Sequence, residues 1–511
     1  MKNRFSKVVS VVVVSTLVAA ACSNSKDESG AATTSIGGQA PTTTGAATAT
    51  STAATTPAET DATNATEATE APATSSADST DESVSSETTE ATDAAPPTTD
   101  DSERDTFEPI TGVPGVSDTK IAFAAIGTRS SNPLGTCILD CYLDGINAYF
   151  AFRNSEGGIY GRQLVLDEEL DDELANNQVR ALDVISANTS FGVFEATLLS
   201  SGWGDLDAAG IPTYAWGIQP ADSANRTHNF PSSVLRCGDC TAHPVPYAIK
   251  VAGAKHAASI GYGATENSKQ CVTTTGNSIT KYSADIGADL AYFNDNLTFG
   301  LPNGIGPEVS AMKDAGVDFV ATCIDLNGMK TLAQELQRQG MDDVTLYHPN
   351  TYDQQFISDG GELFEGDFVG VIFTPFEADA SNTTLGDFLE WMGKAGKTPT
   401  ELAMVGWINA SVAFEGLLGA GPQFDRAKVT DATNALTADT AGGLTRPVNW
   451  TKAHTPYTND TRPADEQGEC TSMVRVEDGK FVTVAPPETP WLCWSSTEWA
   501  DPTFTSFGES G

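Results

Sequence analysis

Apolar and polar positions follow two periods in turn along residues 119–215. Apolar runs and strict alternation predict buried β-strands, whereas apolar residues three or four positions apart predict amphipathic helices. The expected strands are 120–126, 163–168, 191–194 and 211–215, and the expected helices are 144–154, 179–185 and 198–209. Strands that alternate with helices in this way favour parallel strands joined by crossover helices.

The same rhythm restarts near His256. It predicts strands at 257–262, 317–322 and 344–347 and helices at 308–315, 329–336 and 407–418. Further on, Asp478 and Gly479 lie between two short apolar runs, a pattern typical of a hairpin with a tight turn. Two successive α/β units predict two lobes that face a cleft, and in such sheets ligands bind beyond the carboxyl ends of the strands. Candidate contacts therefore follow Ile126, Phe194, Ala215, Tyr262, Thr322 and Tyr347.

A short cationic head, a mostly apolar run from Val8 to Val18 and three alanines precede Cys22. This order predicts a secretory signal peptide over residues 1–21, with an apolar part too short to span a membrane. Residues 22–110 are rich in Ser, Thr, Ala, Asp and Glu and have little apolar surface to bury, so we expect a disordered tether. A cysteine at the cleavage point before such a tether resembles a bacterial lipoprotein. The resemblance implies a lipidated Cys22 and an extracytoplasmic protein anchored to the cell membrane.

The number of cysteines agrees with this interpretation. The chain has 9 cysteines, so 9 − 1 = 8 remain besides Cys22. An even set fits pairing in an oxidising compartment, whereas an unlipidated Cys22 would be an odd free thiol. The alanines before Cys22 also suit the ordinary signal peptidase, so cleavage without lipidation is the alternative.

Cys237 and Cys240 have the spacing of a redox motif. We favour a structural disulfide over a redox pair or a metal site, because a zinc site needs four ligands and only His243 is nearby. Sequence alone does not fix the connectivity. The other expected pairs are Cys137–Cys141, Cys271–Cys323, which would tie two loops, and Cys470–Cys493, which would staple the hairpin.

The charge of the chain excludes several partners. Its formal net charge is −40, so it has no means to neutralise nucleic-acid phosphates or to form a basic membrane-binding patch. We interpret acidic pairs such as Asp171-Asp172 as solvated faces rather than a catalytic pair. Nor do we find a second apolar run of the ~20 residues that cross a bilayer.

Enzyme motifs are missing from the sequence. It contains no Gly-x-Ser-x-Gly, no His-Glu-x-x-His and no phosphate-binding loop signature, and its 5 histidines are dispersed. We therefore predict that the protein is not an enzyme and needs no cofactor or metal.

Several stretches resemble one family. Gly145–Phe150 followed by Asn154–Arg162, with Gly157-Gly158-Ile159 inside it, is similar to the passage before the second strand of extracellular solute-binding proteins of the branched-chain amino-acid (Leu/Ile/Val-binding) type. Further matching stretches are Ala209–Pro212, Met312–Val320, Gly328–Ala333 and Gly406–Ala410. Their order and spacing carry the resemblance over about residues 116–443.

The resemblance implies a type I periplasmic-binding-protein fold of class α/β, with two lobes, each a mainly parallel sheet with flanking helices. Three hinge crossings are expected near 230–236, 366–375 and 443–450. Lobe 1 would comprise residues 111–235 and 372–443, and lobe 2 residues 236–371 and 444–511.

The cleft residues follow in part from the resemblance. Members of the family hold an amino-acid ligand by hydroxyl groups of the first lobe, and the corresponding position falls at Ala196 or Thr197 in this sequence. Thr197 would keep the hydroxyl contact to an α-amino acid, whereas Ala196 would lose it. Aromatic side chains at Trp216, Tyr352 and Trp407 predict an aromatic-lined pocket, with packing between the lobes as the alternative. The expected polar contacts of the second lobe are Asn267, Asp325 and Asn327.

Together these features predict a lipid-anchored solute-binding protein of an ABC importer. It would capture a small polar molecule, an amino acid or a related amide or carboxylate, and present it to a membrane permease. A ligand-sensing receptor domain without transport is one alternative. A secreted enzyme is the other, because fold alone does not determine function.

Overall fold

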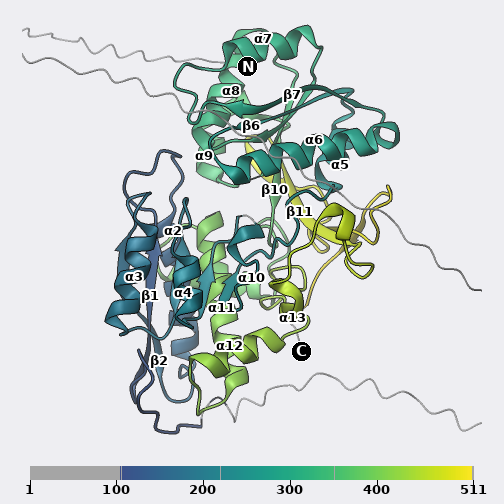
Figure 1. The fold of residues 1–511 in the computed structure, drawn as a ribbon. Coiled ribbons are helices and arrows are strands. Elements are labelled where there is room, and N and C mark those ends of the chain that lie inside the picture. The colour runs from purple at the N-terminus through teal and green to yellow at the C-terminus, as the bar shows by residue number, and fades with distance from the viewer. Residues whose placement is uncertain (1–103, 105, 219, 350, 509–511) are drawn as a thin grey trace, which may run out of the picture. The chain divides into compact units, whose positions relative to one another are not determined.

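The computed structural model describes Arg104 and residues 106–218, 220–349 and 351–508 (Figure 1). The predicted signal peptide 1–21, Cys22 and nearly all of the predicted tether lie outside the described residues.

The first sheet is parallel, with the strand order β2-β1-β3-β4-β5. Its strands are β1 (Lys120–Gly127), β2 (Gln163–Asp171), β3 (Val193–Ala196), β4 (Thr213–Ala215) and β5 (Asn229–Pro231). The helices beside it are α2 (Leu139–Ser155), α3 (Asn177–Ala187), α4 (Trp203–Ala208), α10 (Thr384–Lys394), α11 (Glu401–Ala420) and α12 (Arg426–Ala435), with the 3₁₀ turn η1 (Pro220–Asp222).

Strand alternation gives this sheet two buried faces. Phe123 and Ala125 of β1 belong to the core that includes α2 and α11, whereas Ala124 and Ile126 pack with α3 and α4. Successive side chains of a strand point to opposite faces, so an all-apolar strand predicts helices on both sides. The observed layers follow from this pattern.

Two glycines allow α2 and α11 to lie side by side (Figure 1). A Cβ atom at Gly145 would lie 1.7 Å from the carbonyl oxygen of Ala403, and one at Gly406 would lie 2.1 Å from that of Tyr142. Backbone approach of this kind leaves no room for a side chain. Gly145 and Gly406 are the first residues of two stretches that resemble the solute-binding family. Both glycines thus have a packing role.

The second sheet has nine strands in the order β14-β13-β11-β10-β9-β8-β6-β7, with β12 paired to β11. Strands β6 to β10 pair in parallel, and β11 to β14 add antiparallel pairs. The strands are β6 (His256–Tyr262), β7 (Asp289–Leu297), β8 (Phe319–Cys323), β9 (Thr345–His348), β10 (Phe368–Val371), β11 (Glu469–Glu477), β12 (Lys480–Thr483), β13 (Trp491–Trp494) and β14 (Thr503–Thr505). The helices and 3₁₀ turns beside it are α5 (Pro244–Ala252), α6 (Glu266–Ile286), α7 (Gly306–Asp314), α8 (Leu326–Arg338), α9 (Gln354–Gly360), η2 (Gly361–Phe364) and η3 (Asn459–Thr461), and the short α13 (Trp450–Ala453) packs against α12.

The chain passes between the two sheets in segments that bond to one another. The backbone N–H of Thr374 donates to the carbonyl oxygen of Leu444 at 2.8 Å, and that of Tyr457 donates to the carbonyl oxygen of Arg236 at 3.0 Å. The ring of Trp450 in α13 lies 5.4 Å from the ring of Phe230 in the first sheet. Residues around α13 therefore pack with the first sheet, which differs from the predicted boundary at 443/444. The other lobe boundaries stay predictions.

Among the described helices, α11 alone is long and apolar enough to cross a membrane by length and composition. Its 18-residue window is 83% buried inside the protein. Helix α11 lies against α2 and α12. The prediction that the chain has no second apolar run of membrane-spanning length is therefore wrong. Burial on this scale is typical of a core helix.

Candidate functional site

Loops from the two sheets meet at one hydrogen bond. The Asn327 side-chain amide, in the first turn of α8, donates to the carbonyl oxygen of Pro133 at 3.3 Å. Pro133 lies in the loop after β1, where Asn132 bonds the backbone of Leu134 and Thr136. Gly135 has φ +77°, which favours glycine, and a Cβ atom there would lie 2.8 Å from the Asn327 amide nitrogen and displace this side chain.

Asp172 organises the first-sheet side of this region. Its carboxylate is fully buried and accepts hydrogen bonds from the hydroxyl groups of Thr128 and Thr197 and from the backbone N–H of Leu174. The Thr128 hydroxyl also accepts the Leu198 N–H at 3.2 Å. The expectation that Asp172 is solvated is wrong, because its partners come from loops after three different strands.

The buried side chains of Asn177 and Glu195 form a hydrogen-bonded pair that holds the loop after β3. The Asn177 side-chain carbonyl accepts the N–H groups of Ser201 and Gly202 at 2.8 and 2.7 Å, and its amide donates to Glu195 at 2.9 Å. Burial raises the pKa of Glu195 well above its ordinary value of 4.5. Sequence reasoning missed both residues. The signal was a glutamate inside the apolar strand from Val193 to Ala196.

Asp325 occupies the corresponding place after β8. It caps α8, accepting the Gly328 N–H at 2.6 Å and the Tyr262 hydroxyl at 3.0 Å through Oδ1. Its Oδ2 is buried and has no partner among the described residues. Burial raises the pKa of Asp325 above its ordinary value. A buried carboxylate oxygen without a partner is costly, so this atom is a candidate for contact with a ligand.

The structure brings some predicted site residues to the strand ends. Thr197 lies beside Asp172, to which its hydroxyl group donates. Trp216 follows β4, its backbone N–H donates to the Glu195 carbonyl oxygen at 2.8 Å, and the residue is 8% exposed. Asn267 is the second residue of α6 and is half-buried. No ring contact within the described ranges joins Trp216 to Tyr352 or Trp407.

Tyr352 and Trp407 lie in the core. The Tyr352 hydroxyl both donates to Glu377 and accepts the Phe376 N–H. Trp407 is 0% exposed, with the rings of Tyr149, Phe152 and Phe388 at 5.0 to 5.8 Å. These contacts favour the packing alternative, so neither residue is kept in the candidate site.

The eight described cysteines pair as expected, in Cys137–Cys141, Cys237–Cys240, Cys271–Cys323 and Cys470–Cys493. Cys470 and Cys493 face each other on β11 and β13, so this bond joins the hairpin to its neighbouring strand. Cys271–Cys323 ties α6 to the end of β8 rather than two loops.

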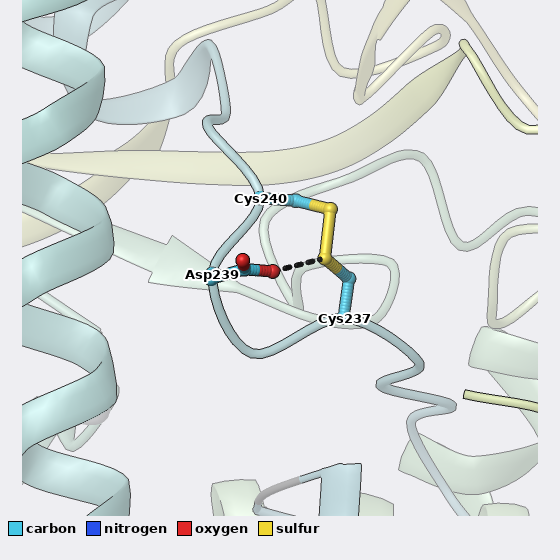
Figure 2. Close-up of side chains that lie close together, drawn as sticks. All are labelled: Cys237, Asp239 and Cys240. Atoms are coloured by element: carbon cyan, nitrogen blue, oxygen red, sulfur yellow. Dashed lines mark hydrogen bonds between the residues drawn. A yellow bond between two sulfur atoms is a disulfide. The ribbon is translucent and has the colours of Figure 1, made fainter. Parts of the chain in front are cut away.

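Figure 2 shows Cys237, Asp239 and Cys240, whose potential metal-binding atoms lie within 4.8 Å of one another. Both sulfur atoms are bonded to each other. The Asp239 carboxylate accepts the Asn459 N–H at 2.9 Å. Each atom of the cluster thus has a structural partner in the oxidised protein.

A family model described as periplasmic binding protein matches residues 121–479. The chain belongs to the periplasmic binding protein family. The match covers the first sheet and the second sheet as far as β11, and it agrees with the resemblance found in the sequence. The predicted type I fold, with mainly parallel sheets and flanking helices, is confirmed. No curated protein matches the chain significantly.

Solved structures of this family share the fold. A leucine-binding protein LivK from Thermotoga maritima is 15% identical with a TM-score of 0.55, and the match covers 71% of this chain and 98% of that one. A solute-binding protein from R. palustris in complex with benzoate is 15% identical, covering 74% and 98%, with a TM-score of 0.54. A fatty acid ABC transporter substrate-binding protein from Thermomonospora curvata is 17% identical, covering 74% and 95%, also with a TM-score of 0.54.

Proposed function

We propose that this periplasmic binding protein is the extracytoplasmic solute-binding component of an ABC importer and captures a small polar molecule between its two sheets. The observation that carries the proposal is the family match over residues 121–479. The polar groups at the strand ends support it, because ligands of open α/β sheets bind there. The structural neighbours include a leucine-binding protein, a solute-binding protein in complex with benzoate and a fatty acid substrate-binding protein, so the fold accepts chemically different solutes.

The proposal includes a lipid anchor at Cys22. All eight other cysteines form disulfides, which leaves the ninth without a partner in its own chain. The predicted tether, residues 22–110, would then act as a polar spacer between the membrane and the binding protein. Replacing Cys22 with Ala should move the protein from the membrane fraction to the soluble fraction, and intact mass of the wild-type chain should show the added acyl groups. An unmodified Cys22 in the membrane fraction would contradict the anchor.

Capture is tested by identifying what the protein carries. The full chain is purified without added solute, unfolded in guanidinium chloride, and the released small molecules are identified by mass spectrometry. We expect one solute per chain, which should rebind after refolding. A protein that releases nothing and binds none of the solutes offered would contradict capture. A partner permease is expected to co-purify with the loaded protein in mild detergent.

The candidate site makes a narrower prediction. Trp216→Ala and Asn327→Ala should each weaken binding of the identified solute while the fold is retained, since loss of one good buried contact costs about 1–3 kcal/mol. The exposed Asp431 on α12 offers a control, and Asp431→Asn should bind as the wild type does. Unchanged affinity in both site variants would place the solute elsewhere.

A further inference from the structure

Several hydrogen-bond donors on the first-sheet side of the candidate site are already occupied by carboxylates of the chain. Asp171 accepts the backbone N–H groups of Arg129 and Ser130 at 3.1 and 3.0 Å, and that of Glu173 at 2.9 Å. Asp172 accepts the N–H of Leu174 and, as described above, the hydroxyl groups of Thr128 and Thr197. Donors of this kind would otherwise bind an anionic ligand group. Two carboxylates of the chain hold them instead.

The occupied hydroxyl groups change what a ligand meets. A hydroxyl has one hydrogen to donate and two lone pairs to accept with. The hydrogens of Thr128 and Thr197 both point to Asp172, so these groups have only acceptor capacity left. A ligand carboxylate offers no hydrogen for a hydrogen bond, and burying it without donors is strongly unfavourable.

The second-sheet side presents a buried carboxylate oxygen of its own. Asp325 has a side chain that is more than nine-tenths buried, and its Oδ2 has no partner among the described residues. In the carboxylate form this atom accepts hydrogen bonds and donates none. The Gly328 N–H and the Tyr262 hydroxyl are bonded to the other oxygen, Oδ1.

Within the described strand-end segments, no free cation balances these carboxylates. In segments 128–138, 172–176, 197–202, 216–218, 232–236, 263–265, 324–325 and 351–353, the Lys and Arg residues are Arg236, which is paired with Glu466 at 2.7 Å, and Arg129. The Arg129 guanidinium is paired with Asp140 at 2.6 Å and Glu169 at 2.9 Å. The chain as a whole has a formal charge of −40, which raises the local concentration of cations at its surface.

We infer that the solute is an organic cation that presents an ammonium or guanidinium group and carries no free carboxylate. The inference rests on the proposed function and narrows it. Asp325 Oδ2 accepts a hydrogen bond from the cationic group, and the first-sheet side contributes acceptor atoms and negative charge. Solutes whose only charged group is a carboxylate, such as benzoate or a fatty acid, are excluded by the same polarity.

The test compares two probe sets on the refolded, solute-free full chain by thermal shift and isothermal titration calorimetry. The cationic set is agmatine, putrescine and choline, and the carboxylate set is benzoate, decanoate and leucine. We expect at least one cationic probe to bind and to raise the Tm, with no response to the carboxylate set. Binding of the carboxylate set alone would overturn the inference and leave capture intact. A protein that binds neither set, yet releases a solute bearing a free carboxylate when purified, would likewise overturn the inference while capture stands.

Variants separate charge from packing. Asp325→Asn keeps the shape of the side chain and removes its charge, so we expect about 10- to 100-fold weaker binding of the cationic probe. Asp431→Asn removes one charge from the exposed surface of α12 and should change the affinity less than twofold. Equal affinities in the wild type and Asp325→Asn, with the fold shown intact by circular dichroism, would overturn the role of Asp325. If neither probe set binds and no solute is released, both the inference and the proposed function fail.

Discussion

The hydroxyl group of Tyr352 donates a hydrogen bond to the carboxylate of Glu377. Tyr352 follows β9, and Glu377 lies between β10 and α10, so the bond ties a strand-end loop to a segment that connects the two sheets. The same hydroxyl accepts the Phe376 N–H at 2.7 Å. Burial raises the pKa of Tyr352 well above its ordinary value and also raises that of Glu377. Both groups are therefore engaged with each other in this contact rather than facing a ligand.

Tyr352→Phe should destabilise the protein by about 1–3 kcal/mol, because it removes one hydrogen bond from the half-buried Glu377 carboxyl group and leaves the Phe376 N–H without its partner. The free energy of unfolding in urea, followed by tryptophan fluorescence, measures this loss. Tyr247→Phe is the matched control, since the Tyr247 hydroxyl makes no hydrogen bond to the described residues and its loss should cost less than about 0.5 kcal/mol. Equal costs in the two variants would show that the Tyr352 bond adds nothing to stability.

Glu401, the first residue of α11, predicts a pH dependence. Burial raises its pKa from 4.5 to about 8, the Tyr352 N–H lowers it, and the charge of Asp353 raises it. The folded protein therefore binds a proton that the unfolded chain releases above pH 4.5. Stability from this group is fully present below pH 4.5 and falls as the pH rises toward 8. Because the side chain retains some exposure, we expect a loss of about 2–4 kcal/mol rather than the full linkage value.

The Glu401→Gln variant has no titrating group at position 401. Its free energy of unfolding should therefore fall less between pH 5 and pH 8 than that of the wild type. Urea unfolding at three pH values within this window measures the difference between the two slopes. Parallel curves for wild type and variant would assign the pH dependence to other groups.

Strand positions were predictable where burial made them apolar. The expected strand 120–126 is observed as Lys120–Gly127, and the hairpin turns at Asp478 and Gly479, both with positive φ. Strand β7 was missed because it lies at the edge of the second sheet and exposes polar residues. Its apolar run, Leu290–Phe293, is short and only partly buried, the polar Asn294–Asn296 follow it, and β7 is held in place by pairing with β6.

The candidate site was predictable only in part. Asp325 was predicted because it follows a strand, and Thr197 because the family resemblance puts a hydroxyl group at Ala196 or Thr197; both lie at the strand ends. The role of Asp172 was hidden because its partner Thr128 lies 44 residues earlier, and no local pattern records a contact over that distance. Aromatic residues such as Trp407 gave a misleading signal, because a ring that packs in a core and a ring that contacts a ligand look the same in sequence.

The disulfides should differ in their contribution to stability. Cys271–Cys323 spans 52 residues, whereas Cys237–Cys240 spans 3. In the chain-entropy model, the longer loop restricts the unfolded chain more, which gives about 4 kcal/mol for the former and about 2 kcal/mol for the latter. Double substitution of each pair with alanine, followed by urea unfolding under oxidising conditions, measures both values. A larger loss from the Cys237–Cys240 variant would show that native contacts, rather than loop entropy, dominate.

Trp450 stabilises a buried carboxylate near the connecting segments. Its indole N–H donates to Asp439 Oδ2 at 2.7 Å, and Asp439 Oδ1 accepts the Ala441 N–H at 2.8 Å. Burial raises the pKa of Asp439, and the indole bond lowers it. Trp450→Phe removes the donor, so we expect a loss of about 2–4 kcal/mol, part of it from reduced packing.

The pH dependence of that loss distinguishes the hydrogen bond from packing. Without the indole, the pKa of Asp439 rises further, and a neutral carboxyl group needs the lost donor less than a carboxylate does. The cost of Trp450→Phe should therefore be smaller at pH 5 than at pH 8. Trp407→Phe is the matched control, because Trp407 is equally buried and its indole N–H has no partner among the described residues. Its cost should not change with pH, and a Trp450→Phe cost that is equally constant would assign the whole effect to packing.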